Sequence, residues 1–225
     1  MKKKGLFITF EGLDGSGKTT QMELLSDYLK NRGFDVITTI EPGGTKIGRK
    51  IRKILLDEEN LDMSHKAETF LFLASRAELV SKVIAPALRE GKIVISDRFF
   101  DSTIVYQGIA RGLGKKQILE MSLWATDEIV PDITFLLSVK VSRGEERIDI
   151  PHQLSFAEIR LISRSGKKDR IELEEDSFKK SIYKGYLDIA RRNKDRIVVI
   201  DGEDSIENIF EEIKNKVFEY LEKKR

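Results

Sequence analysis

Short apolar runs alternate with longer segments of helical period along this chain. The apolar runs are continuous, with Ile, Val, Phe and Leu in adjacent positions, which is typical of strands covered on both faces. They lie at residues 6–10, 92–96, 133–139 and 196–200, and a more polar run lies at 34–40. Strands that alternate with helices predict an α/β fold with a parallel sheet and helices on both faces.

Helical periodicity is clearest in residues 19–33, where apolar side chains return to one face and Gly33 supplies a stop. Residues 64–90 and 205–223 show the same period. Residues 141–162 keep no period, so we expect an inserted segment there.

Composition narrows the class of protein. The 225 residues contain no repeat or linker, so a single domain spanning 1–225 is expected. A formal net charge of +2 argues against a broad nucleic-acid-binding surface. The absence of cysteine excludes disulfides and thiol nucleophiles and fits a cytoplasmic setting, and no apolar stretch is long enough to span a membrane.

The first apolar run leads into GLDGSGKT, residues 12–19, which matches the phosphate-binding pattern GxxxxGK[ST] between a strand and a helix. Glycines let successive backbone N–H groups point inward, Lys18 reaches the outer phosphates, and Thr19 is placed for Mg²⁺. A glycine turn that only joins strand to helix is the structural alternative. The expected ATP-binding residues are Gly12, Asp14, Gly15, Ser16, Gly17, Lys18, Thr19 and Thr20.

Asp97 and Arg98 follow the run 92–96. A carboxylate at the carboxyl end of a neighbouring strand lies where such sheets bind ligands, so Asp97 is expected to assist the metal and Arg98 to bind an anion. A surface ion pair would explain the same residues. The sequence lacks a GTPase base-reading motif and the protein-kinase HRD and DFG motifs. A small-molecule kinase or a shape-changing ATPase therefore stays open.

Several stretches together resemble the thymidylate kinase family: FEGLDGSGKTT, EPGGT, FLFLASR, ISDRFFDSTIVYQG and DRIELEEDSF, with GYLDIA and RIVVIDG near the end. The resemblance implies a P-loop kinase fold with a parallel sheet of five strands and a small lid. It also implies Mg²⁺-dependent transfer of the γ-phosphoryl of ATP to dTMP in dTTP synthesis. Family members are commonly homodimers.

The resemblance further assigns roles at the acceptor site. Asp14 would contact the sugar 3′-hydroxyl and Arg98 the acceptor phosphate, while Phe72 would stack on thymine and Arg76 would bond its edge. Tyr106 would exclude a 2′-hydroxyl. Without the resemblance, Phe72 and Tyr106 would be read as core residues and Arg76 as a solvated charge. The implied acceptor-binding residues are Asp14, Phe72, Arg76, Arg98, Ser102, Thr103, Tyr106 and Gln107.

An arginine should close over the transferred group, and the loop at 14–17 contains none. It is therefore expected from RLISRSGKKDRIE, where Arg164 and Arg170 are favoured over Arg160. A solvated basic loop is the alternative. The implied catalytic residues are Lys18, Asp97, Arg98, Arg164 and Arg170.

Three features depart from the family pattern. Ile40 stands where an arginine is usual, residues 138–140 read SVK where an acidic residue is usual, and the lid with its insertion, about 141–172, is longer than usual. These departures leave two alternatives open: a nucleotide-binding module with weak turnover, and a related nucleoside monophosphate kinase with another acceptor.

Overall fold

A computed structural model describes residues 5–139, 169–171 and 173–223. Its centre is a parallel sheet of five strands in the order β2-β3-β1-β4-β5. This arrangement confirms the predicted α/β fold and its parallel sheet. The strands are β1 (Leu6–Glu11), β2 (Val36–Ile40), β3 (Ile93–Asp97), β4 (Ile133–Ser138) and β5 (Ile197–Asp201).

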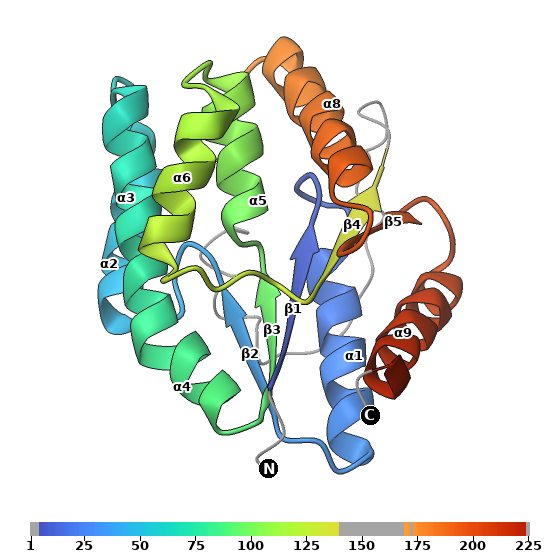
Figure 1. Cartoon of the computed structure of the whole chain (residues 1–225). Helices are drawn as coiled ribbons and strands as arrows, with labels where there is room; N and C mark the ends of the chain where they lie inside the picture. The colour runs from blue at the N-terminus through green and yellow to red at the C-terminus, as the bar shows by residue number, and fades with distance from the viewer. Residues whose placement is uncertain (1–4, 140–168, 172, 224–225) are drawn as a thin grey trace.

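Helices cover both faces of the sheet (Figure 1). The longer ones are α1 (Lys18–Asn31), α2 (Lys46–Leu56), α3 (His65–Leu79), α6 (Lys115–Ala125), α8 (Asp176–Arg192) and α9 (Ile206–Lys223). Shorter segments are η1 (Glu58–Asn60), η2 (Val80–Ile84), α4 (Ala85–Arg89), α5 (Phe100–Thr103) and η3 (Ile104–Ala110).

The two faces of the sheet carry separate hydrophobic cores. On one face, α1 and α9 pack on side chains such as Ile8 and Phe10 of β1. On the other, the helices from α3 to α8 enclose Phe7 of the same strand. Adjacent residues of β1 thus face opposite cores, as the pleat requires. This double burial explains why the strand sequences are continuous apolar runs.

The predicted helix at 64–90 is a continuous helical stretch in which α3 passes through the π-helical segment η2 into α4. A second π-helical segment, η3, continues α5. Such segments are rare and occur often at functional sites. The predicted lid and insertion at 141–172 fall mostly outside the described residues.

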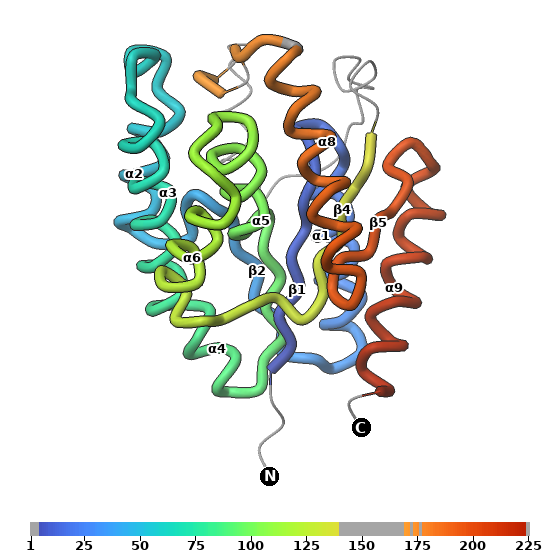
Figure 2. The backbone as a smooth tube through the Cα atoms, turned by 45° about the horizontal axis from the view of Figure 1, so that its top comes forward, coloured from blue at the N-terminus to red at the C-terminus, as the bar shows by residue number. Residues whose placement is uncertain are grey.

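The central position of β1 determines where loops meet. In its register with β3, Phe10 lies opposite Asp97, so the loop after β1 and the turn after β3 leave the sheet side by side. Figure 2 shows that β1 begins and α9 ends on the side of the molecule away from these two loops. Among the described helices, none has the length and apolar character needed to cross a membrane.

Candidate active site

The GLDGSGKT sequence forms the turn between β1 and α1. Gly12, Gly15 and Gly17 have φ angles of 140°, 80° and 90°, in the region that side chains disfavour. At Gly12 a Cβ would also lie 2.5 Å from the carbonyl oxygen of Leu137. The loop therefore depends on glycine both for its turn and for its close approach to β4.

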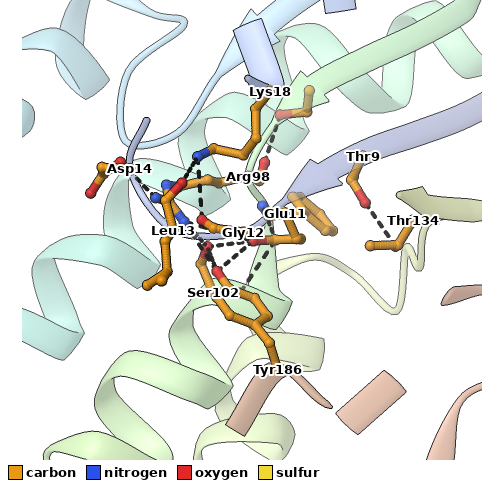
Figure 3. A network of polar contacts seen from close by, with 12 residues as sticks. Thr9, Glu11, Gly12, Leu13, Asp14, Lys18, Arg98, Ser102, Thr134 and Tyr186 are labelled. Atoms are coloured by element: carbon orange, nitrogen blue, oxygen red, sulfur yellow. Dashed lines mark hydrogen bonds and ion pairs between the residues drawn. The ribbon is translucent and has the colours of Figure 1, made fainter. Parts of the chain in front are cut away.

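Lys18 folds back over this loop (Figure 3). Its Nζ donates to the carbonyl oxygens of Gly12, at 3.2 Å, and Leu13, at 2.8 Å. Burial lowers the pKa of Lys18, and the nearby Arg98 lowers it further. Among the described residues, the hydrogen bonds of Lys18 go to neutral carbonyls, so its ammonium can gain strongly from phosphate oxygens, which supports the expected role of Lys18.

Thr19 and Asp97 were both predicted as metal-binding residues, and the structure brings them together. Thr19 Oγ1 donates to Asp97 Oδ2 at 3.2 Å. Hydroxyl and carboxylate oxygens are the ligands that Mg²⁺ prefers. The described residues hold no cluster of three metal-binding side chains. The pair therefore fits a Mg²⁺ ion that takes its other ligands from phosphates and water.

Two further predicted ATP-binding residues lie beside this pair. The Ser16 hydroxyl is buried without a hydrogen-bond partner in the described part of the chain. Thr20 is half-buried in the first turn of α1.

Arg98 lies at the centre of a polar network that joins three parts of the chain (Figure 3). Its Nη2 donates to Asp14 Oδ1 at 2.8 Å, and its Nη1 donates to Ser102 Oγ at 3.1 Å and to Tyr186 Oη at 3.0 Å. Against the effect of burial, Arg98 and Lys18 lower the pKa of Asp14 to about 2. Asp14 is thus a carboxylate at the mouth of the loop, paired with a fixed guanidinium.

Glu11 holds this network in place and was missed in the sequence. Its Oε1 accepts from the backbone N–H of Phe99 at 2.9 Å, and its Oε2 accepts from Ser102 Oγ at 2.6 Å and Tyr186 Oη at 2.8 Å. Burial raises the pKa of Glu11. The available signal was a charged residue at the end of an apolar strand.

Arg76 is buried beneath the loop after β2. Its Nε donates to Glu41 Oε2 at 2.7 Å and its Nη2 to the carbonyl oxygen of Phe99 at 3.2 Å. Arg76 Nη1 and Glu41 Oε1 are buried without partners among the described residues. Burial raises the pKa of Glu41 to about 7, although Arg76 acts to lower it. Phe72 is half-buried one helical turn earlier, on the same side of α3.

The predicted residues Thr103, Tyr106 and Gln107 are all buried, on α5 and η3. The Tyr106 ring lies under Arg98, with the guanidinium carbon 5.4 Å from its centroid. Gln107 donates to Glu68 on α3 at 2.8 Å. The structure thus places Tyr106 against Arg98 and joins Gln107 to Glu68 of α3.

The two predicted lid arginines have different outcomes. Arg164 lies outside the described residues. Arg170 is 3% exposed and donates to the carbonyl oxygen of Leu55 at 3.0 Å and to Glu68 Oε2 at 2.5 Å. In this structure Arg170 therefore ties the chain before α8 to α2 and α3.

Arg52 of α2 is a second residue that the sequence reading missed. Its Nη1 donates to the carbonyl oxygen of Pro42 at 3.0 Å. Burial lowers its pKa, while Asp169, Asp97 and Asp14 act to raise it, which places its charge near the site. Arg52 offers a cation at the loop that follows Ile40, the position where the family pattern has an arginine. The signal was a basic helix after EPGGT.

The fold and this site define a P-loop phosphotransferase. A glycine loop with its lysine and threonine lies against the guanidinium of Arg98, which follows the neighbouring strand, and transfer between two phosphates requires positive charge near both of them. The chain matches the thymidylate kinase family model over residues 10–213 and therefore belongs to the thymidylate kinase family.

Individual relatives agree. The chain is 44% identical over 217 residues to a thymidylate kinase of Thermosipho africanus, covering 96% of this chain and 100% of the relative. It is 44% identical over 214 residues to one of Halothermothrix orenii, covering 95% and 97%. A thymidylate kinase crystal structure from Ehrlichia chaffeensis superposes with a TM-score of 0.71 at 32% identity, covering 95% and 98%.

Proposed function

We propose that this protein transfers the γ-phosphoryl group of ATP to dTMP, giving ADP and dTDP. The observation that carries the proposal is the 2.8 Å pair between Arg98 and Asp14, which sets a fixed cation directly against the phosphate loop. The family and the relatives favour this reaction over a binding module or another acceptor.

The acceptor side follows from the charges. Arg98 and Arg52 supply the positive charge for the dTMP phosphate, and Asp14 accepts from the sugar 3′-hydroxyl. Arg76 offers its unpartnered Nη1 to the base, and Phe72 supplies a face for stacking. Tyr106, with its ring held under Arg98, fills the space of a 2′-hydroxyl.

The transfer itself needs positioning more than proton chemistry. A phosphate monoester is largely dianionic at neutral pH, since its second pKa is about 6, so its oxygen attacks without a general base. A bond forms from that oxygen to the γ-phosphorus, and the bond to the β-phosphate oxygen breaks. Lys18 neutralises the phosphates of ATP, and Arg98 holds the attacking phosphate in line.

Mg²⁺, when bound at Thr19 and Asp97, would offset charge on the β- and γ-phosphates. An arginine from the lid is proposed to stabilise the transferred group. Arg164 is the better candidate, because Arg170 is engaged with Glu68 and the carbonyl oxygen of Leu55.

A coupled ADP-release assay tests the proposal directly. The purified enzyme is given Mg·ATP with dTMP, dUMP, UMP, CMP or AMP, and kcat/KM is compared between acceptors. We expect dTMP to be the best acceptor. Binding of dTMP without ADP release would support the binding module, and a preference for another nucleotide would support a different kinase.

We also propose a cytoplasmic homodimer. Helices α3 and α6 pack against each other and expose Phe70, at 60%, and Trp124, at 84%. Large exposed apolar side chains on adjacent helices are typical of an interaction surface. Sedimentation should show a dimer that Phe70→Glu dissociates, and a monomeric parent protein would contradict the assignment. The cysteine-free composition supports the cytoplasm.

A further inference from the structure

A buried charged cluster lies behind the proposed base pocket, and phosphoryl transfer does not use it. Its centre is Glu68 of α3, which is 0% exposed. Glu68 Oε1 accepts from Gln107 Nε2 at 2.8 Å and from Arg111 Nε at 3.3 Å. Glu68 Oε2 accepts from Arg111 Nη2 at 3.2 Å and from Arg170 Nη2 at 2.5 Å. We call these four residues the Glu68 cluster.

The cluster keeps Glu68 ionised. Burial alone would raise the pKa of Glu68, but the hydrogen bonds from Gln107, Arg111 and Arg170 lower it below the ordinary value. Glu174 pairs with Arg111 Nη1 at 2.5 Å, so the two arginines of the cluster are matched by two carboxylates, Glu68 and Glu174. A carboxylate with two buried arginines as neighbours is well satisfied.

An ionised carboxylate fixes which way the Gln107 amide faces. It can only accept hydrogen bonds, so the amide end beside it must be the NH₂ group. The carbonyl oxygen of Gln107 is then the other end of the planar amide. That oxygen has no hydrogen-bond partner among the described residues and, although Gln107 as a whole is only 2% exposed, it is not completely buried.

This unpartnered carbonyl complements one kind of pyrimidine. Thymine and uracil present a donor at N3 and an acceptor at O4, whereas cytosine presents an acceptor at N3 and a donor at N4. Arg76 Nη1 is a buried donor and the Gln107 carbonyl is an acceptor, each without a partner among the described residues. Together they match thymine and oppose cytosine.

We infer that Glu68 is a positioning residue for acceptor selectivity, because it fixes the Gln107 amide with its carbonyl toward the base and so favours 4-oxo over 4-amino pyrimidines. This inference rests on the proposed function, since it assumes that Gln107 lies beside the acceptor base. Glu68 itself touches no substrate.

Glu68→Gln provides the decisive variant. The two arginines need an acceptor, so the new amide should turn its oxygen toward them and its NH₂ group toward Gln107. The Gln107 amide would then reverse and offer its own NH₂ group to the base. After this reversal the Gln107 NH₂ group would face the N3–H donor of thymine and lose a hydrogen bond. Facing the N3 acceptor of cytosine, the same NH₂ group would gain one.

The measurement compares dTMP with 5-methyl-dCMP, which differs from it only at the 4-substituent and N3. We expect the ratio of their kcat/KM values to fall by about tenfold or more in Glu68→Gln, the effect of about one hydrogen bond. The ratio does not depend on the amount of folded enzyme. An unchanged ratio, with both acceptors slowed equally, would show that Glu68 is merely structural and overturn the inference.

Two controls complete the design. Glu174→Gln removes the other partner of Arg111 but leaves the Glu68–Gln107 bond, so its ratio should match that of the parent enzyme. In a Gln107→Leu background, adding Glu68→Gln should change the ratio no further, and a further fall would overturn the inference. If the parent enzyme does not phosphorylate dTMP, it is the proposed function that fails.

Discussion

Arg98 combines an unusual backbone conformation with a side chain that donates three hydrogen bonds. Its φ angle is 70°, and its N–H is held by the carbonyl oxygen of Phe10 at 2.9 Å. A non-glycine residue in this region carries strain that the surrounding structure must support, and such residues cluster at functional sites. Here the surrounding support is Glu11, which binds the backbone directly after Arg98.

Replacing Arg98 with lysine should test the value of its planar fork. Lysine keeps the charge but cannot contact Asp14, Ser102 and Tyr186 at once. We expect kcat/KM for dTMP to fall by about a hundredfold, the worth of about one to two hydrogen bonds to charged groups. Steady-state kinetics checks this, with circular dichroism as the folding control, and a loss below about threefold would contradict the role of the fork.

Glu41 should give the ligand-free enzyme a characteristic dependence of stability on pH. Its pKa is about 7 in the folded protein against an ordinary value of 4.5. The folded state therefore binds the proton more tightly than the unfolded state does. Its contribution to the free energy of unfolding is full below about pH 4.5, declines as the pH rises to about 7, and is then constant.

Urea unfolding between about pH 5 and about pH 8 measures this dependence. Glu41→Gln removes the titrating group, so the decline should be shallower in that variant than in the parent protein. Equal slopes in the two proteins would show that Glu41 does not hold its proton in the folded state.

Among single residues, the sequence predicts best those whose spacing is set by the need to bind phosphate. Lys18, Thr19 and Asp97 could be predicted as site residues because a phosphate loop fixes its own pattern and the next strand end is adjacent; the structure places Thr19 beside Asp97, and the roles of all three stay predictions. Glu11 and Arg52 were not found, because their roles depend on contacts with Ser102, Tyr186 and Pro42 that are distant in the sequence.

Helix α2 packs closely against the loop that carries Glu41. Thr45 caps this helix by accepting from the N–H of Gly48 at 2.9 Å, and the helix packs against α3. A Cβ at Gly48 would lie 2.2 Å from the carbonyl oxygen of Gly43. The glycine therefore sets how closely the helix and the loop approach.

Gly48→Ala should reverse the usual helix preference. Alanine normally stabilises a helix interior by about 1 kcal/mol relative to glycine. At this position the clash is with backbone, so we expect a loss of about 1 to 3 kcal/mol and a higher KM for dTMP. Thermal unfolding and kinetics measure both effects. Exposed Lys50→Ala on the same helix is the control, and a more stable Gly48→Ala would refute the close approach.

The positions of the strands could be predicted from the sequence more closely than those of the helices that bury only one face. The strands were located to within a few residues, because β1, β3 and β4 are buried on both faces and the partly exposed edge strands β2 and β5 still carry Ile and Val. Helices α2, α6 and α8 received no individual prediction, since each buries only one stripe and lies between motifs. The helix at 64–90 was predicted, but the π-helical turns of η2 within it and of η3 after α5 were not, because apolar spacing does not distinguish them from an α-helix.

At the scale of the whole molecule, the site draws on both ends of the chain. The P-loop follows β1, near the start of the chain. Tyr186 lies on α8, near its end, and donates a hydrogen bond to Glu11 at 2.8 Å. Arg196, before β5, likewise pairs with both carboxylate oxygens of Asp101 at 2.7 and 2.8 Å. Substrate binding should therefore stabilise the entire fold.

Saturating dTMP should raise the melting temperature of the parent enzyme. At about a hundredfold excess over Kd, ligand binding adds about 2.7 kcal/mol. For a chain of this size that corresponds to about 5 to 10 °C. Differential scanning fluorimetry measures the shift. Thymidine, which lacks the phosphate that Arg98 would bind, is the control, and equal shifts from both ligands would contradict a phosphate-centred site.

The sheet separates the two hydrophobic cores from each other. Ile213 and Val217 of α9 belong to the core on the face covered by α1, apart from the core that surrounds Tyr106 and Tyr186. Random changes in the α9 layer should therefore alter how much active enzyme a cell accumulates while leaving its choice of nucleotide intact. Substitutions can accumulate in that layer over evolution without changing which nucleotide the enzyme binds.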